Sequence, residues 1–469
     1  MKVKILTVLL GAALGFAANS HASQSKIPAF APEAPIPQLN LSEYKLKNGM
    51  TVWVLPRNGV PRVDFVLSFR NAGNIADGAD QAGLADMLAG MLTEGTQLRN
   101  SKAIAESAQS YGGGVSARAG LDGLSINAYA LASNAESMAK LMAEIARQPS
   151  FPESELTLAK TNALQGLKLA KAQPGYQARL VMDKNLYGAH PYGNTNADEK
   201  AINAVNRQLL QSEHAKRFRP DQALLIITGR ISAKKAHSLA KKAFADWTVT
   251  GSNNNTTISV APNKSTPIRV LVQRPNSVQS ALRLGSVSIP TKHADYIPLR
   301  LANTVIGSGF SSRINQNLRE DKGYTYGARV SLNTYAHGGI LTGSSDVRNE
   351  VTGAALKEFI YEYQRMTTEL VPEVELDRTK RYMAGGYLLS NQQQAAVAGT
   401  LAGYWLDGLP ASAMSEYVTK IREVTAEQVK AVSAKYFQAK DQSIVVVGDK
   451  AVAEQLKAFG DFEQRPMAE

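Results

Sequence analysis

The segment FPESELTLAK, residues 151–160, returns 220 residues later as VPEVELDRTK, residues 371–380. Both segments read P-E-x-E-L-x-x-x-K, and a proline directly before glutamates is typical of a helix start. Three further pairs of segments match in the same order along the chain: residues 215–218 with 434–437, 221–229 with 441–448, and 243–247 with 458–462. Four ordered matches indicate a duplicated domain of roughly 200 residues, a period too long for a solenoid repeat.

Each half shows the same order of local patterns. Strand-like runs come first: residues 50–56 and 63–69 in one half, 268–275 and 281–289 in the other. A helix, further strand, long helical stretches and a final apolar strand follow. This order predicts an α+β fold, with two homologous domains that each pack a mostly antiparallel sheet with helices. We expect them at residues 39–247 and 269–462, joined by an Asn/Ser/Thr/Pro-rich linker at 248–268.

The composition excludes several classes of function. The 469 residues include no cysteine, so there is no disulfide, no thiolate nucleophile and no thiolate metal ligand. Lysine and arginine outnumber aspartate and glutamate by 52 to 40, a formal charge of +12 that falls to +10 without Lys2 and Lys4. Because the basic residues are dispersed along the chain, we expect no nucleic-acid partner.

The N-terminus has the pattern of a secretory signal. Lys2 and Lys4 precede an apolar run at residues 5–18, which is too short to span a bilayer of about 30 Å comfortably. Ser20 and Ala22 then place small residues at the two positions that a signal peptidase reads. We predict a signal peptide at residues 1–22, a mature chain without stable membrane insertion and, given the lack of cysteines, a bacterial periplasmic location.

The segment GLADMLAGMLTEGT, residues 83–96, follows a strand-like run and a Gly/Asp-rich loop, and YGGG follows at 111–114. Together with the repeat, these segments resemble the pitrilysin/insulinase-type zinc peptidases, whose chains consist of repeated α/β domains of this size. The family's mark is H-x-x-E-H on its first long helix. Two histidines one turn apart bind Zn²⁺, the glutamate polarises the metal-bound water, and a glutamate on a later helix is the third ligand.

The resemblance also shows that these functional side chains are missing. On the alignment, Asp86 and Gly90 stand at the two histidine positions, Ala89 at the glutamate base, and Gly166 in the neighbourhood of the third ligand. The six histidines offer no substitute, because the closest pair is 23 residues apart and no helix face carries two. We therefore predict that this chain binds no cofactor and no catalytic zinc.

A different family element is present in the second half, within FSSRINQNLREDKGYTYGARVS at residues 310–331. The form L-R-x-x-x-G-x-x-Y is matched here by Leu318, Arg319, Gly323 and Tyr326. In the family, this Arg and Tyr face the zinc across a central chamber and hold the substrate near the scissile bond. The resemblance implies that Arg319 and Tyr326 contact substrate.

Local chemistry is compatible with that role. We expect a helix that ends near Lys322, a left-handed Gly323 that stops it, and a strand that begins at Tyr326. An arginine and a tyrosine folded back on a glycine can point into one space. A guanidinium and a phenol then supply donors for a carbonyl or a developing oxyanion.

Three functions remain open. The resemblance implies a non-catalytic, substrate-binding subunit of a heterodimeric peptidase, with Arg319 and Tyr326 completing the site of an H-x-x-E-H partner that holds the zinc and cleaves peptides. The second function is a peptide-binding pseudopeptidase that acts alone or as a homodimer, and the third is a structural assembly subunit. The strand after Tyr111 matches the one that pairs with the substrate backbone in active relatives.

Overall fold

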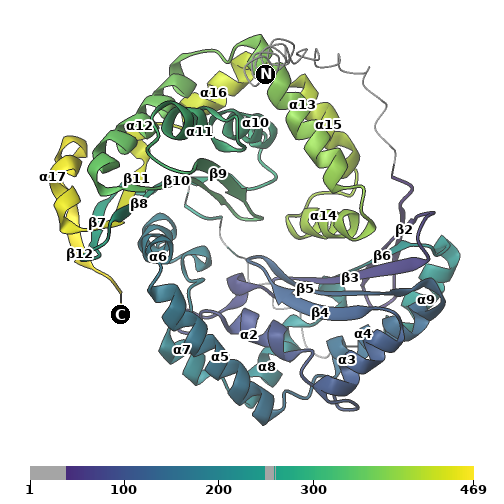
Figure 1. Cartoon of the computed structure of the whole chain (residues 1–469). Coiled ribbons are helices and arrows are strands. Elements are labelled where there is room, and N and C mark those ends of the chain that lie inside the picture. The colour runs from purple at the N-terminus through teal and green to yellow at the C-terminus, as the bar shows by residue number, and fades with distance from the viewer. Residues whose placement is uncertain (1–38, 249–257, 259, 263, 469) are drawn as a thin grey trace, which may run out of the picture. The chain divides into compact units, whose positions relative to one another are not determined.

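The computed structural model describes residues 39–248, 258, 260–262 and 264–468. The predicted signal peptide at residues 1–22 and part of the predicted linker lie outside these ranges. Residues from Gln38 onward form one compact unit. Two six-stranded sheets, one from each half of the sequence, organise this unit (Figure 1).

The first half contributes six strands and eight helices to the described ranges. The strands are β1 Ser42–Lys45, β2 Thr51–Pro56, β3 Arg62–Arg70, β4 Gly114–Ala119, β5 Gly123–Leu131 and β6 Ala223–Gly229. The helices are α2 Leu84–Met91, α3 Ser101–Ser110, α4 Ala135–Arg147, α5 Glu153–Lys171, α6 Pro174–Tyr187, α7 Glu199–Ala204, α8 Arg207–Arg217 and α9 Ala233–Phe244.

The second half repeats this order of elements with local variations. Its strands are β7 Arg269–Gln273, β8 Gln279–Ser288, β9 Ala328–Thr334, β10 Gly339–Arg348, β11 Ser443–Gly448 and β12 Glu463–Pro466. Its helices are α10 Tyr296–Gly307, α11 Arg313–Asn315 with the π-helical continuation η5 Gln316–Asp321, α12 Thr352–Thr368, α13 Glu373–Ser390, α14 Gln394–Leu406, α15 Ala413–Glu423, α16 Ala426–Tyr436 and α17 Ala453–Leu456.

The predicted fold is confirmed. The strand orders are β1-β2-β6-β3-β5-β4 and β12-β7-β11-β8-β10-β9, so equivalent strands occupy equivalent places in the two sheets. Most neighbouring pairs are antiparallel, but β2 with β6, β7 with β11 and β7 with β12 are parallel, which makes both sheets mixed. The outer place beside β2 is filled by β1, and the outer place beside β7 is filled by β12. Neither of these two short strands was predicted from the sequence.

Helix starts follow the chemistry of the repeated segments. Pro152 and Pro372 cap α5 and α13 in extended conformation, and each helix then opens with glutamates, whose negative charge is favourable at a helix N-terminus. Thr425 and Gln428 form a reciprocal capping box at the start of α16. The repeated P-E-x-E-L segments are therefore equivalent helix beginnings in the two halves.

The two halves exchange a helix. The face of the first sheet that carries Trp53, Val66 and Ile226 packs against Val397 and Leu401 of α14, which belongs to the second half. Conversely, α6 of the first half covers a face of the second sheet. Its Ala178, Met182 and Leu186 pack there with Val270, Val272, Ala281, Val445 and Val447. Each sheet is thus completed by a helix from the other half (Figure 1).

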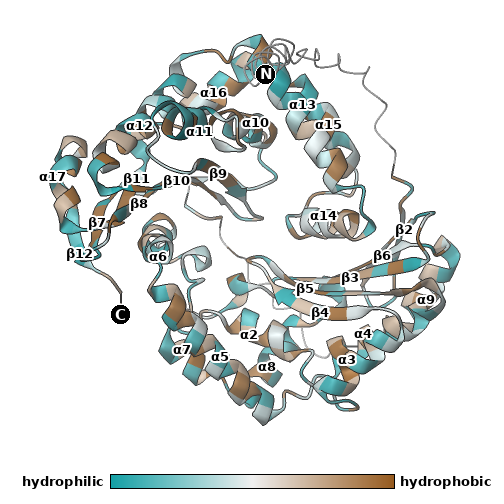
Figure 2. Ribbon diagram, viewed as in Figure 1, coloured by the Kyte–Doolittle hydropathy of each residue, from teal (hydrophilic) through white to brown (hydrophobic). Residues whose placement is uncertain are grey.

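This exchange explains why the central strands are apolar on both sides. All seven residues of β6 and all six of β11 are buried. A strand covered on both faces reads as a continuous hydrophobic run rather than an alternating one. Figure 2 shows the sheets rich in hydrophobic residues, whereas the helices carry both kinds.

Polar contacts reinforce the junction. Arg70 of β3 donates to the backbone oxygen of Trp405 in α14, and its guanidinium carbon lies 3.8 Å from the centre of the indole ring. Asp122 accepts hydrogen bonds from the Tyr192 hydroxyl at 2.5 Å and from the Ala336 amide at 3.0 Å, which joins the halves a second time. Among the helices of the described ranges, none has the length and apolar character needed to cross a bilayer.

Candidate functional site

The first-half site is built on α2. Gly83 precedes this helix with φ +82°, a left-handed conformation that favours glycine. Three of the four predicted degenerate positions, Asp86, Gly90 and Gly166, line one cavity of about 550 Å³ between α2 and α5. Ala89, the fourth, is 2% exposed and packs into the core of the first half instead.

These side chains do not fit a zinc ion. Ala89, Gly90 and Gly166 offer no donor atom, and the remaining candidate, Asp86, accepts a hydrogen bond from Asn74 Nδ2 at 2.9 Å. A catalytic zinc site takes three protein ligands and leaves one position open. Within the part of the chain that the structure describes, no group of three His, Cys, Asp or Glu side chains could hold a metal ion. We assign no metal chemistry to this half.

The cavity wall is largely apolar with a carboxylate border. Its apolar members include Met87, Met91, Leu158, Ala159, Ala163 and Leu167, and its carboxylates are Asp86, Glu94 and Glu155. Burial raises the pKa of Glu94 above its usual value, and the like charge of Glu155 raises it further. The place where the family has its zinc centre is, in this chain, an apolar cavity with acidic groups at its border.

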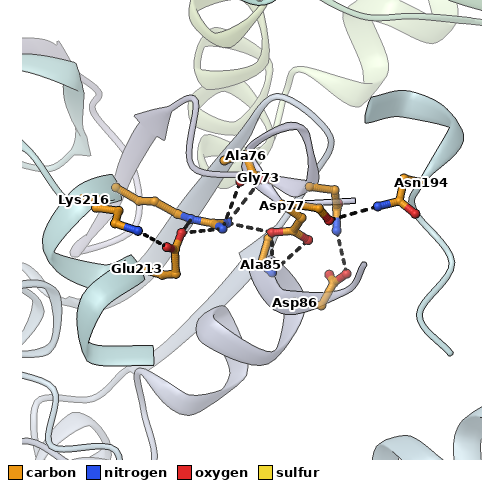
Figure 3. A network of polar contacts seen from close by, with 11 residues as sticks. Gly73, Ala76, Asp77, Ala85, Asp86, Asn194, Glu213 and Lys216 are labelled. Carbon is orange, nitrogen blue, oxygen red and sulfur yellow. Dashed lines mark hydrogen bonds and ion pairs between the residues drawn. The ribbon is translucent and has the colours of Figure 1, made fainter. Parts of the chain in front are cut away.

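A buried ion-pair network holds α2 in place (Figure 3). Arg217 of α8 donates to Asp77 Oδ1 at 2.8 Å, with the two side chains 3% and 0% exposed. The Asp77 carboxylate also accepts from the Ala85 amide at 3.1 Å, so it binds one of the free N–H groups of the first turn of α2. Glu213 completes the network at 2.8 Å from Arg217.

The second half uses a weaker version of the same device. Asp295, at the N-cap of α10, accepts from Tyr436 Oη and Lys435 Nζ of α16, each at 3.0 Å. In the repeated segment, Lys435 and Tyr436 stand where Lys216 and Arg217 stand in the first half. The repeat therefore preserves a tether between this helix pair, although the cation of one half has become a phenol in the other.

The Arg319 segment is anchored on both sides. Arg313 of α11 makes two hydrogen bonds to Glu375 of α13, at 2.9 and 2.7 Å, and is itself 8% exposed. Asn317, one turn later, donates to Glu362 of α12 at 2.9 Å. These contacts fix the helix, which leaves the side chain of Arg319, 37% exposed, on its cavity side.

The end of this helix follows the prediction. Gly323 has φ +63°, a left-handed conformation that ends the helix, and the Tyr324 amide donates to the Leu318 carbonyl, six residues earlier, at 2.8 Å, which closes the π-helical turn. The prediction that a strand begins at Tyr326 is wrong, because β9 begins at Ala328. In the residues before β9, the Gly327 amide donates to the Thr325 hydroxyl at 3.1 Å, which forms a local turn.

Arg319 and Tyr326 line the same cavity, of about 600 Å³. The Arg319 guanidinium carbon lies 4.5 Å from the centre of the Phe310 ring and its Nε lies 3.2 Å from Glu320 Oε1. Tyr326 is 94% exposed and Phe310 65%. The structure thus brings the two predicted residues to one hollow and presents a cation and two aromatic rings there.

The sequence did not single out Phe310, Asn303 or Asn315. Asn315 donates to the Phe310 carbonyl at 2.7 Å and accepts from the Ala328 amide at 3.4 Å, so it ties the preceding loop to β9. Asn303 is 7% exposed and lines the cavity, and its Oδ1 has no hydrogen-bond partner in the described structure. A buried amide oxygen without a donor is a binding point for a ligand N–H or a water.

These features define a two-domain α+β fold of the kind found in zinc peptidases built from two homologous halves. Residues 64–199 match the family model described as insulinase (peptidase family M16), and residues 204–383 match the one described as peptidase M16 inactive domain. The chain belongs to the M16 (insulinase/pitrilysin) peptidase family, as predicted from its motifs.

Relatives include both named peptidases and a named non-peptidase. An uncharacterized zinc protease of Mycobacterium tuberculosis is 23% identical over 407 residues, covering 82% of this chain and 89% of its own. The non-peptidase homolog YmxG of Helicobacter pylori is 21% identical over 464 residues, covering 96% and 99%. A crystal structure of a peptidase M16 inactive domain from Pseudomonas fluorescens superposes with a TM-score of 0.81 at 27% identity, covering 88% of this chain and 99% of that one.

Proposed function

We propose that this chain is the non-catalytic, substrate-binding subunit of a heteromeric zinc peptidase. Its partner would be a paralogous chain with an H-x-x-E-H motif, which supplies the zinc and the water-activating glutamate. This chain would supply Arg319 and Tyr326 to the completed site. One contrast carries the proposal: the first-half cavity has no metal-ligand set, whereas the second-half cavity presents a cation and an exposed phenol together.

The geometry supports contact with a peptide carbonyl. A guanidinium offers donors in a fixed fork, and a phenol offers one more. Because Tyr326 is 94% exposed, its hydroxyl can reach a substrate that lies outside this chain. Donors placed where negative charge develops stabilise a transition state more than a ground state. We expect these two side chains to act on kcat more than on KM.

Co-expression with secreted H-x-x-E-H paralogues from the same genome tests the proposal. The complex should hydrolyse an unstructured peptide, while this chain alone should not. Arg319→Ala and Tyr326→Phe should each lower kcat by roughly 10²–10³, the range seen when one such donor is removed. Their complexes should keep the elution volume of the wild-type complex.

A matched substitution separates substrate contact from assembly. Arg348 also lies near this segment and donates to the Gly323 carbonyl at 3.4 Å, but it does not line the cavity. Arg348→Ala should leave turnover within about twofold of the wild type. Equal losses in Arg319→Ala and Arg348→Ala would contradict the assigned role.

The homolog named a non-peptidase favours a second candidate, a peptide-binding pseudopeptidase that acts alone or as a homodimer. Purified chain that takes no H-x-x-E-H partner and binds peptides without cleaving them would support this candidate over the first. A structural assembly subunit is a third candidate, which predicts neither peptide binding nor an effect of Arg319→Ala. The periplasmic location stays a prediction of the N-terminal pattern.

A further inference from the structure

The cavity between α2 and α5 has free space at Gly90 and Gly166, two of the positions where the family carries zinc ligands. A Cβ added at Gly90 or Gly166 would meet nothing within 4 Å. Its volume of about 550 Å³ falls in the range of about 300–1,000 Å³ typical of small-ligand pockets. The space has the size of a binding site.

The walls select for an apolar group. Met87 and Met91 of α2 face Leu158 and Leu167 of α5 across this space, and Leu158 is 55% exposed. Methionine side chains adapt to ligands of different shape because they are unbranched and polarizable. An exposed leucine on such a wall loses contact with water when an apolar side chain enters, and this burial is favourable.

The border of the cavity selects for a cation. Asp86, Glu94 and Glu155 line it, and Glu94 and Glu155 lie close enough for each charge to affect the other. Arg179 also lines the cavity, but its guanidinium lies 3.8 Å from Asp183. A positive charge placed beside Glu94 and Glu155 would relieve their mutual repulsion.

A peptide can reach this site along β4. This strand ends the first sheet, pairs with β5 on one side, and has no other strand partner in the described chain. It also contacts α2, the helix that forms one cavity wall. An extended peptide added to the free edge of β4 would therefore run beside the cavity mouth, with alternate side chains directed to one face.

We propose that the former zinc site is a side-chain pocket that takes an apolar residue of a bound peptide, with an adjacent lysine or arginine of that peptide at Glu94 and Glu155. This inference rests on the proposed role in peptide binding and adds a sequence preference to it. It requires neither a partner subunit nor hydrolysis.

Peptide affinity of the purified chain tests the pocket. The probes are three fluorescein-labelled Gly/Ser peptides with a central Leu-Arg, Ala-Arg or Leu-Glu pair, measured by fluorescence anisotropy. We expect the Leu-Arg peptide to bind at least about tenfold more tightly than the Ala-Arg peptide, because burial of one leucine is worth about a factor of ten or more. It should also bind more tightly than the Leu-Glu peptide, because a third carboxylate beside Glu94 and Glu155 adds repulsion where an arginine relieves it. Equal affinities for the three peptides would overturn the proposal.

Two sets of variants locate the effect. Gly166→Leu fills the cavity and should abolish the preference for Leu over Ala. Gly386→Leu is the matched control, since Gly386 lies 220 positions later on α13 and also has open space around its Cβ position. Glu94→Gln with Glu155→Gln should abolish the preference for Arg over Glu and leave the preference for Leu. The same response in Gly166→Leu and Gly386→Leu would refute the pocket.

These outcomes are independent of the partner. A Leu-Arg preference in a chain that assembles with no H-x-x-E-H subunit would support the pocket and reject the proposed heteromeric peptidase. Turnover in a complex that binds the three peptides with equal affinity would support the heteromeric peptidase and reject the pocket.

Discussion

Separation of the two halves should unfold both of them, because each sheet is completed by a helix from the other half. A polypeptide of residues 39–248 keeps the first sheet but lacks α14. Five side chains that α14 buries would then face water: Trp53, Leu55, Val66, Leu224 and Ile226, which are 0–5% exposed in the whole chain.

The expected loss is as large as the stability of a whole domain. Full burial of a large apolar side chain contributes about 1.5–3 kcal/mol, so five of them amount to about 8–15 kcal/mol as an upper estimate. Typical domains have a free energy of unfolding of about 5–15 kcal/mol. Residues 39–248 alone should therefore show no cooperative unfolding transition.

Urea denaturation followed by tryptophan fluorescence, from Trp53 and Trp247 in residues 39–248 and from Trp405 as well in the whole chain, and by circular dichroism measures this. The whole chain should unfold in a single transition, and residues 39–248 should regain that transition when co-expressed with residues 258–468. In the whole chain, Leu401→Ala on α14 should lower the free energy of unfolding by about 2–5 kcal/mol. A sigmoidal transition of residues 39–248 alone, with a free energy of unfolding above about 3 kcal/mol, would refute the helix exchange as a requirement for folding.

Three further substitutions probe individual features. Arg217→Ala leaves the Asp77 carboxylate buried without its cation and should lower the free energy of unfolding by about 3–5 kcal/mol in urea titrations, and an unchanged midpoint would contradict this. Gly307→Ala places a Cβ 2.2 Å from a backbone nitrogen of β9 and should cost about 1–3 kcal/mol by the same assay, and an unchanged free energy of unfolding would contradict this. Burial raises the pKa of Asp407 to about 7 and that of Asp183 to about 6, so each group stabilises the folded state at a pH where its carboxyl is protonated. Their contribution is complete below pH 4 and is lost as the pH rises through 6 and 7. Asp407 alone should cost about 2–3 kcal/mol between pH 5 and 7, and Asp407→Asn should remove that slope.

The repeat in the sequence predicted the two sheets, their helices and the equivalent helix starts at Pro152 and Pro372. It did not predict the helix exchange. Hydrophobic periodicity shows that a helix such as α14 has an apolar face, but it does not say which sheet that face meets. The partner is determined by the path of the chain after α13, which no local pattern encodes. β12 was missed because its four residues, Glu463–Pro466, lack a β-branched or alternating pattern.

The candidate sites were predictable to different degrees. The spacing of Arg319 and Tyr326 predicted that they would share a space, and both line one cavity. The segment at Tyr326 was predicted as strand from its alternating pattern, but it is a loop. Thr325 makes side-chain hydrogen bonds to Gly327 there, and sequence alternation does not reveal such bonds. The sequence predicted that the zinc ligands are missing, but it did not predict the cavity at Asp86, Gly90 and Gly166, since its walls come from helices that are remote in sequence.

The network around Arg217 bears on whether the first-half cavity is a relic or a functional site. Buried ion pairs are weak contributors to stability, because the desolvation of both charges offsets their attraction, and apolar residues of similar size often replace them without loss. What Arg217 and Asp77 do provide is position: they join α8, the loop at Gly73 and Ala76, and the first turn of α2. The same helix also packs Leu84, Leu88 and Met91 into the core of the first half, so a fixed N-terminus serves the packing as well as the cavity. The position of α2 also sets where its cavity-lining residues, such as Met87 and Met91, would contact a bound side chain. Because the second half ties α10 to α16 through Asp295, a tether of this kind belongs to the repeated fold, and only the peptide-affinity measurements with Gly166→Leu decide whether the first-half cavity still binds a side chain.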